Sequence, residues 1–171
     1  ELTFELLSLF VGNDISKSEL SSIVEKSYSN AFTSQDYVTY QKLNHSIIVE
    51  LFNGPTLAFK DFAMQLLIPL FDHFLGDENR KVNLLVATSG DTGSAAINAV
   101  SKSKHVNIFC LFPKNRISEF QRKQMSTVGK ENITLCEIDG TFDDCQNIVK
   151  SILGDQNFCK SNSVAAVNSI N

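Results

Sequence analysis

Residues 82–93 read Val82-Asn83-Leu84-Leu85-Val86-Ala87-Thr88-Ser89-Gly90-Asp91-Thr92-Gly93. The first six are almost wholly apolar, and the run has the length of a buried strand. Polar residues and two glycines follow, and the small residues Ser94-Ala95-Ala96 then suit a helix that begins near Thr92. A buried strand that passes through a glycine turn into a helix is the repeating unit of α/β proteins.

The same succession of elements continues on both sides of this stretch. Downstream, residues 106–112 and 133–138 predict two further strands, and helices are expected from Ser118 and from Thr141. Upstream, residues 47–52 predict a buried strand, and apolar residues then recur every four positions in a largely buried helix: Phe62, Leu66, Leu70 and Phe74. Strands that alternate with helices predict an α/β fold with a mostly parallel sheet flanked by helices.

The first part of the chain has a different character. Apolar residues at helix spacing over 2–10, and a Ser16–Glu19 capping box, predict a short helical segment. Residues 33–45 are polar and unpatterned, which is typical of a linker or surface loop. We therefore expect two parts, a helical N-terminal segment with its linker (1–46) and an α/β portion (47–171).

Composition narrows the class of protein. The 171 residues are 43% hydrophobic with a net charge of −4, which is typical of a globular chain and argues against nucleic acid as a partner. The four cysteines lack CxxC spacing and the three histidines are scattered, so we expect no metal site and a reducing, cytoplasmic location. No apolar stretch approaches a membrane span and no signal segment opens the chain, so no membrane partner is expected. A start at Glu1 and an end at Asn171 suggest cut or processed ends.

The glycine loop Ser89–Gly93 has the form of a cradle for a small anion. Its glycines let backbone N–H groups approach a ligand, and a helix start adds unpaired N–H groups and partial positive charge. The alternative is a tight turn in which Asp91 caps the helix. The residues do not decide between these two interpretations.

A second stretch, Gly54-Pro55-Thr56-Leu57-Ala58-Phe59-Lys60-Asp61-Phe62, places Lys60 between the predicted strand and the apolar helix. A helix start and apolar neighbours both disfavour an ammonium group, and a neutral lysine is a nucleophile for carbonyl groups. The alternative is an ordinary surface lysine. Because ligands of parallel sheets bind beyond the carboxyl ends of strands, we expect the loops at 53–60 and 88–93 to face one crevice.

Taken together, five segments resemble the threonine synthases, which are fold-type II enzymes that use pyridoxal 5′-phosphate (PLP). The matching segments, in the family's order and spacing, are Leu51–Phe62, Ala87–Ala95, Phe112–Ser118, Asp139–Gln146 and Asn168–Asn171. The resemblance implies that Lys60 holds PLP as a Schiff base and that the Ser89, Gly90, Asp91, Thr92 and Gly93 loop holds the substrate carboxylate beside the cofactor. It also implies that Asp91 lies at the cofactor and that Asn168 and Ser169 hold the substrate phosphate.

The reaction implied by this resemblance is a lyase reaction of threonine biosynthesis, in which O-phosphohomoserine and water become threonine and phosphate. Freed Lys60 then moves protons at the substrate carbons. The family's glycine-rich loop for the PLP phosphate and its contact to the pyridine nitrogen lie downstream of this chain. We therefore expect an N-terminal to central fragment that is inactive in isolation.

Two alternatives share these residues. One is a threonine-synthase-like phospholyase that releases 2-oxobutyrate, although Leu57-Ala58 and the Arg116 loop look more like the true synthases. The other is a non-catalytic α/β module that binds a small phosphorylated ligand, in which Lys60 is unreactive. The sequence gives no indication of oligomeric state.

Overall fold

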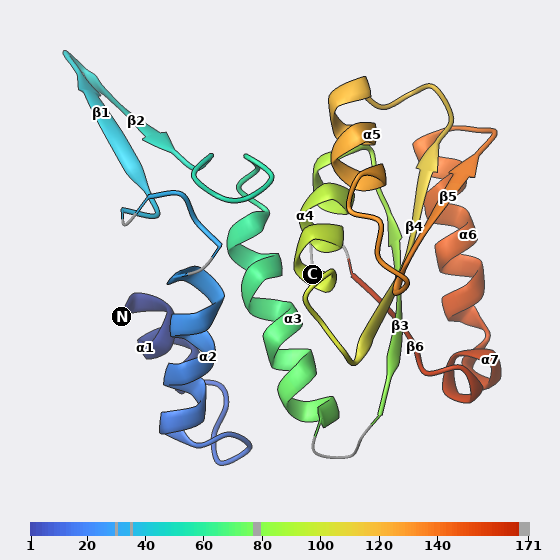
Figure 1. Cartoon of the computed structure of the whole chain (residues 1–171), viewed down its shortest axis with the longest axis horizontal. Helices are drawn as coiled ribbons and strands as arrows, with labels where there is room; N and C mark the ends of the chain where they lie inside the picture. The colour runs from blue at the N-terminus through green and yellow to red at the C-terminus, as the bar shows by residue number, and fades with distance from the viewer. Residues whose placement is uncertain (30, 35, 77–79, 168–171) are drawn as a thin grey trace.

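A four-stranded parallel sheet forms the centre of the computed structural model, which describes residues 1–29, 31–34, 36–76 and 80–167. Its strands are β3 (Val82–Ala87), β4 (Val106–Pro113), β5 (Ile133–Ile138) and β6 (Val164–Ala166). They lie in the order β5-β4-β3-β6, so β3 pairs in parallel with both β4 and β6 (Figure 1). The predicted α/β class is confirmed, while the short strand β6 was not predicted.

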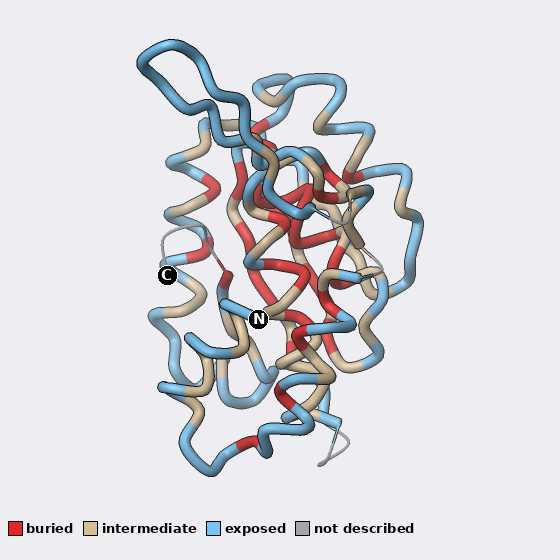
Figure 2. Tube along the Cα trace, turned by 90° about the vertical axis from the view of Figure 1, so that its left-hand side faces the viewer, coloured by how far each residue is buried: buried red, intermediate tan, exposed pale blue. Residues whose placement is uncertain are grey.

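Helices cover both faces of this sheet. Helices α3 (Asp61–Gly76), α4 (Asp91–Val100) and α5 (Glu119–Ser126) lie on one face, and α6 (Phe142–Gly154) and α7 (Gln156–Ser161) lie on the other (Figure 1). Side chains alternate along each strand, so Leu84 and Val86 pack toward α3 and α4 whereas Leu85 packs toward α6. The buried residues accordingly concentrate around the sheet (Figure 2).

Local signals predicted most helix starts correctly. Ser118 and Thr141 each form a capping box with the residue three positions later, Gln121 and Asp144. Helix α2 (Lys17–Ser29) begins beside the predicted Ser16–Glu19 pair, in which each backbone N–H donates to the other side chain. Within the described residues, no helix combines the length and apolarity needed to cross a membrane.

Helix α3 is covered on two sides, by different neighbours. Met64 and Ile68 belong to the core beneath the sheet. Leu66 and Leu70 instead pack against the small cluster formed by α2 and α1 (Leu2–Ser8). Phe74, which we expected to be buried with them, is 44% exposed, although Phe71 and Leu75 beside it pack against the core.

The prediction of a buried strand over 47–52 was wrong. The strand there is β2 (Ser46–Glu50), which pairs only with β1 (Thr39–Leu43) in a separate antiparallel hairpin. Ile47, Ile48 and Val49 are 49–63% exposed, because the hairpin projects from the body of the molecule (Figures 1 and 2). Strand β1 also lies inside the stretch that we expected to be a linker. The division at residues 46 and 47 stays a prediction.

Candidate functional site

The sheet topology defines one edge at which a ligand is expected. Strand β3 has β4 and β5 on one side and β6 on the other, which makes the gap between β3 and β6 a topological switch point. The Ser89–Gly93 loop leaves the carboxyl end of β3 at this point. Asn168 and Ser169, the predicted phosphate ligands, follow β6 but lie outside the described residues.

Lys60 and Asp91 meet across this edge. Lys60 directly precedes α3, its side chain is only 16% exposed, and its Nζ lies 3.9 Å from Asp91 Oδ2. The amine also lies 4.2 Å from the centre of the Phe59 ring. The Lys60 side chain is therefore largely covered rather than fully exposed at the surface.

The two loops meet for a different reason from the one predicted. The lysine loop does not follow a strand of the parallel sheet, because β2 lies in the projecting hairpin. Helices α3 and α4 instead precede and follow β3 on the same face of the sheet, so both run antiparallel to that strand. Their N-terminal ends therefore lie at the carboxyl edge of the sheet, and each end carries one of the two loops (Figure 1).

A buried carboxylate fixes the conformation of the lysine loop. Asp61 is fully buried, and its two oxygens accept hydrogen bonds of 2.8 Å from the backbone N–H and the hydroxyl of Thr56. Burial raises the pKa of Asp61, while the bonds from Thr56 act in the opposite direction. Between these residues Leu57 adopts φ 63°, a left-handed conformation that is unfavourable for leucine. Gly54 packs against Asp61, where an added Cβ would lie 2.5 Å from the aspartate Cβ.

The glycine loop is organised by Thr88, which we did not predict as a site residue. Its buried hydroxyl oxygen accepts hydrogen bonds of 2.9 Å from the N–H groups of both Gly90 and Gly93. The glycine N–H groups are therefore already paired. Within the described part of the chain, the N–H groups of Asp91 and Thr92, in the first turn of α4, remain as donors for an anion.

The alternative in which Asp91 caps α4 was also wrong. Gly90 is the N-cap, at φ 142°, and the helix has no side-chain cap. The Asp91 carboxylate instead bonds to Gln121 Nε2 at 2.7 Å and faces Lys60. Ser89 is exposed, whereas Thr92 is 9% exposed.

Helix α5 supplies two further residues that sequence reasoning missed. Gln121 donates to Asp91, and Gln124 Nε2 donates to the carbonyl oxygen of Thr56 at 3.0 Å. The Ser118-x-x-Gln121 pattern signals a capping box, but nothing local indicates contacts with residues that lie 30 and 68 positions away in the chain.

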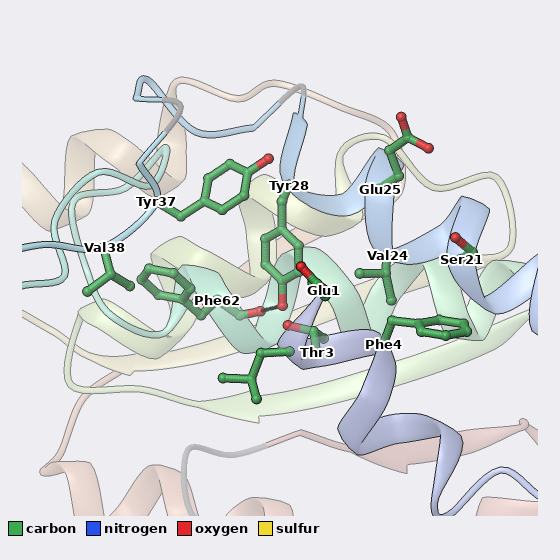
Figure 3. Close-up of a pocket in the computed structure, with 11 residues that line it drawn as sticks. Glu1, Thr3, Phe4, Ser21, Val24, Glu25, Tyr28, Tyr37, Val38 and Phe62 are labelled. Atoms are coloured by element: carbon green, nitrogen blue, oxygen red, sulfur yellow. Dashed lines mark hydrogen bonds between the residues drawn. The ribbon is translucent and has the colours of Figure 1, made fainter.

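A separate pocket of about 680 Å³ lies beside the N-terminal helices. Figure 3 shows Tyr28, Tyr37 and Phe62 along its wall, with the Tyr28 hydroxyl donating to the carbonyl oxygen of Phe62 at 3.1 Å. None of the predicted site residues lines this pocket. The candidate site is therefore the meeting point of Lys60 and the glycine loop.

Comparison with known proteins gives a consistent result. The chain is 45% identical to threonine synthase from Pseudomonas aeruginosa and 35% identical to "Threonine synthase-like 2" from Xenopus laevis, in each case over all of this chain and 36% of the relative. The PLP-bound threonine synthase from Brucella melitensis superimposes with a TM-score of 0.89 at 40% identity, over 98% of this chain and 36% of that one. Yeast threonine synthase gives a TM-score of 0.88, also at 40% identity, over 99% and 36%. No protein-family model matches the chain.

The fold is that of the fold-type II PLP enzymes, with a lysine at the start of one helix and a glycine loop at the start of the next. Within that class, the chain belongs to the threonine synthase family. It spans little more than a third of the length of the curated relatives that it matches.

Proposed function

We propose that this chain carries the lysine-bearing part of a threonine synthase, the lyase that converts O-phosphohomoserine and water to threonine and phosphate. The observation that supports this most directly is the 3.9 Å approach of Lys60 Nζ to Asp91 at the switch point of the sheet. In an α/β protein this is the place where a ligand is expected.

The residues fit the cofactor that the family uses. A cofactor with an aldehyde needs a lysine amine that is reachable, and the Lys60 amine lies beside Asp91 and the Phe59 ring while its side chain remains 16% exposed. PLP, when bound, supplies a ring that stores the negative charge released at a substrate carbon. We propose that Lys60 attaches it and that Asp91 lies beside it.

The other residues have roles that follow from their places in the loop. The first-turn N–H groups of Asp91 and Thr92, with the exposed Ser89, bind the substrate carboxylate at the positive end of α4. Gly90 and Gly93 keep the turn close to Thr88. Lys60 Nζ takes up and returns protons at the substrate carbons. Asn168 and Ser169 bind the substrate phosphate, on the resemblance alone. We further propose a cytoplasmic location, which suits the buried thiols of Cys110 and Cys145.

Reductive labelling tests the cofactor assignment. The longest natural form of the chain is incubated with PLP, reduced with borohydride and mapped by peptide mass spectrometry, because the family's loop for the PLP phosphate lies downstream of this chain. We expect Lys60 to be labelled before exposed lysines such as Lys150, which lies on α6 at the opposite face of the sheet. A Lys60→Arg variant should lose that label and keep the others. Labelling with no preference for Lys60 would refute the assignment.

A second candidate, the phospholyase that forms 2-oxobutyrate, shares Lys60 and the Ser89–Gly93 loop with the synthase, so these residues do not separate the two. Product analysis separates the two in the longest natural form of the chain supplied with PLP and O-phosphohomoserine. Threonine together with phosphate supports the synthase, and 2-oxobutyrate with phosphate supports the phospholyase. Binding of the substrate without either product supports a non-catalytic module.

A further inference from the structure

Gln121, on helix α5, has a side-chain amide whose orientation is fixed at both ends. Its Oε1 accepts from the hydroxyl of Ser118 at 2.9 Å and from the Ser118 N–H at 3.3 Å. The oxygen of the amide is therefore committed to Ser118, because a backbone N–H can only donate. The Nε2 group consequently faces the other way, where it donates to Asp91 Oδ1 at 2.7 Å.

This bond determines the direction of the Asp91 carboxylate. With Oδ1 held by Gln121, the second oxygen, Oδ2, is the one that faces Lys60 Nζ at 3.9 Å. The Asp91 side chain is 52% exposed, and an ion pair with so exposed a partner is too weak to fix a rotamer. A short hydrogen bond to a charged acceptor is the stronger and more directional contact.

The backbone of the glycine loop is shaped to admit this amide. An added Cβ at Gly90 would lie 2.2–2.4 Å from the amide atoms of Gln121. Gly90 also has φ 142°, a backbone conformation that residues with a side chain rarely adopt. One turn further along α5, Gln124 donates to the carbonyl oxygen of Thr56 in the lysine loop. One face of α5 therefore bonds to both loops of the site.

We propose that Gln121 is a positioning residue for Lys60, because it holds the carboxylate of Asp91 in the orientation in which Oδ2 faces the lysine amine. This inference rests on the proposed function for its biological meaning, because it concerns the same site. Its physical content, a coupling from Gln121 through Asp91 to Lys60, is independent of PLP.

A double-mutant cycle on the reactivity of Lys60 measures that coupling. The full chain is methylated with formaldehyde and cyanoborohydride, small reagents that need no cofactor site, and the rate at Lys60 is followed by mass spectrometry relative to Lys150. We expect Asp91→Asn to change the Lys60 rate at least about threefold when Gln121 is present. In a Gln121→Met background the same substitution should change the rate by less than about 1.5-fold.

Two further variants distinguish loss of the bond between Gln121 and Asp91 from misfolding or a general loosening of α5. Gln121→Glu keeps the acceptor for Ser118, and so the helix cap, while removing the donor to Asp91; it should abolish the Asp91→Asn effect as Gln121→Met does. Gln124→Met, on the same helix, should leave that effect intact. The proposal is overturned if Asp91→Asn has no effect in the parent chain, has the same effect in all backgrounds, or loses its effect with Gln124→Met. Failure of PLP to label Lys60 would instead count against the proposed function alone.

Discussion

The Asp61 carboxylate holds the lysine loop in place, and replacing it by alanine should be strongly destabilising. Asp61→Ala removes the acceptor of two 2.8 Å hydrogen bonds and leaves the N–H of the buried Thr56 without a partner. An unsatisfied buried donor costs about 1–3 kcal/mol, and a hydrogen bond to a charged group contributes about 1.5–3 kcal/mol. Relief from burying a charge opposes this loss, since burial raises the pKa of Asp61. We therefore expect the free energy of unfolding to fall by about 2–4 kcal/mol.

Urea unfolding followed by far-UV circular dichroism measures this loss. With a slope of about 2 kcal/mol per molar urea, the midpoint should fall by about 1–2 M. Asp61→Asn is the matched control: its oxygen can accept from the Thr56 N–H and its amide can donate to the Thr56 hydroxyl, so its cost should stay below about 1 kcal/mol. Equal costs for alanine and asparagine would refute the role of these two bonds.

The pH dependence gives an independent check on the same residue. A pKa raised by folding means that folded Asp61 binds its proton more tightly than the unfolded chain does. Its contribution to stability is therefore most favourable at low pH and declines as the pH rises from the ordinary value of 3.8 through the raised pKa. Asparagine has no such decline, so the cost of Asp61→Asn should shrink over that interval. A cost that grows with pH would show that burial is not the dominant influence.

Substitutions at three other positions test the loops and a helix cap. Leu57→Gly, at φ 63° and 58% exposed, should leave the free energy of unfolding unchanged or raise it by up to about 1 kcal/mol, whereas Leu57→Val should lower it by about 1 kcal/mol, both by urea unfolding. Gly93→Ala would place a Cβ 2.5 Å from Thr88 Cγ2 and 2.9 Å from Cys110 Sγ, and it should cost about 1–3 kcal/mol. The substitution should also increase the rate at which a thiol reagent modifies Cys110 in the native state, because burial raises the pKa of this thiol to about 12 and keeps it unreactive. An unchanged rate would contradict the packing argument. Asp144→Asn should lower the free energy of unfolding at neutral pH but not in strong acid. Hydrogen bonds from Thr141 lower the pKa of Asp144, so the stabilisation by its carboxylate is lost as the pH falls through that lowered pKa.

Most of the helix and strand succession could be predicted because its signals are local. The capping boxes at Ser118 and Thr141 lie within four consecutive residues, and the apolar runs of β3, β4 and β5 are long enough to stand out. The resemblance added the expectation that Lys60 and Asp91 belong to one site, and the structure brings their side chains together.

The errors arose where burial depends on a distant surface. Ile47, Ile48 and Val49 are as apolar as a core strand, yet their side chains lie on a hairpin that projects from the sheet. A continuous apolar run predicts a strand but not which surface covers it. The contact between Gln121 and Asp91 joins residues 30 positions apart, and it exists only because α5 packs beside the start of α4.

The electrostatic contributions of the Lys60 ammonium to the stability of the fold are small and of opposite sign. The start of α3 disfavours its ammonium by about 0.3–1 kcal/mol. The Phe59 ring, whose centre lies 4.2 Å from Nζ, stabilises the ammonium by about 0.5–1 kcal/mol, and the ion pair with the half-exposed Asp91 stabilises it by about 0–1 kcal/mol. Because partial burial of the lysine adds a further cost, these contributions nearly cancel. Lysine at this position therefore adds little to the stability of the fold, yet Asp61, Thr56, Gln121 and Gln124 all act to hold its surroundings in one geometry. A lysine that gives little stability, in surroundings that are held in one geometry, fits the proposed use of its amine as a reactive group.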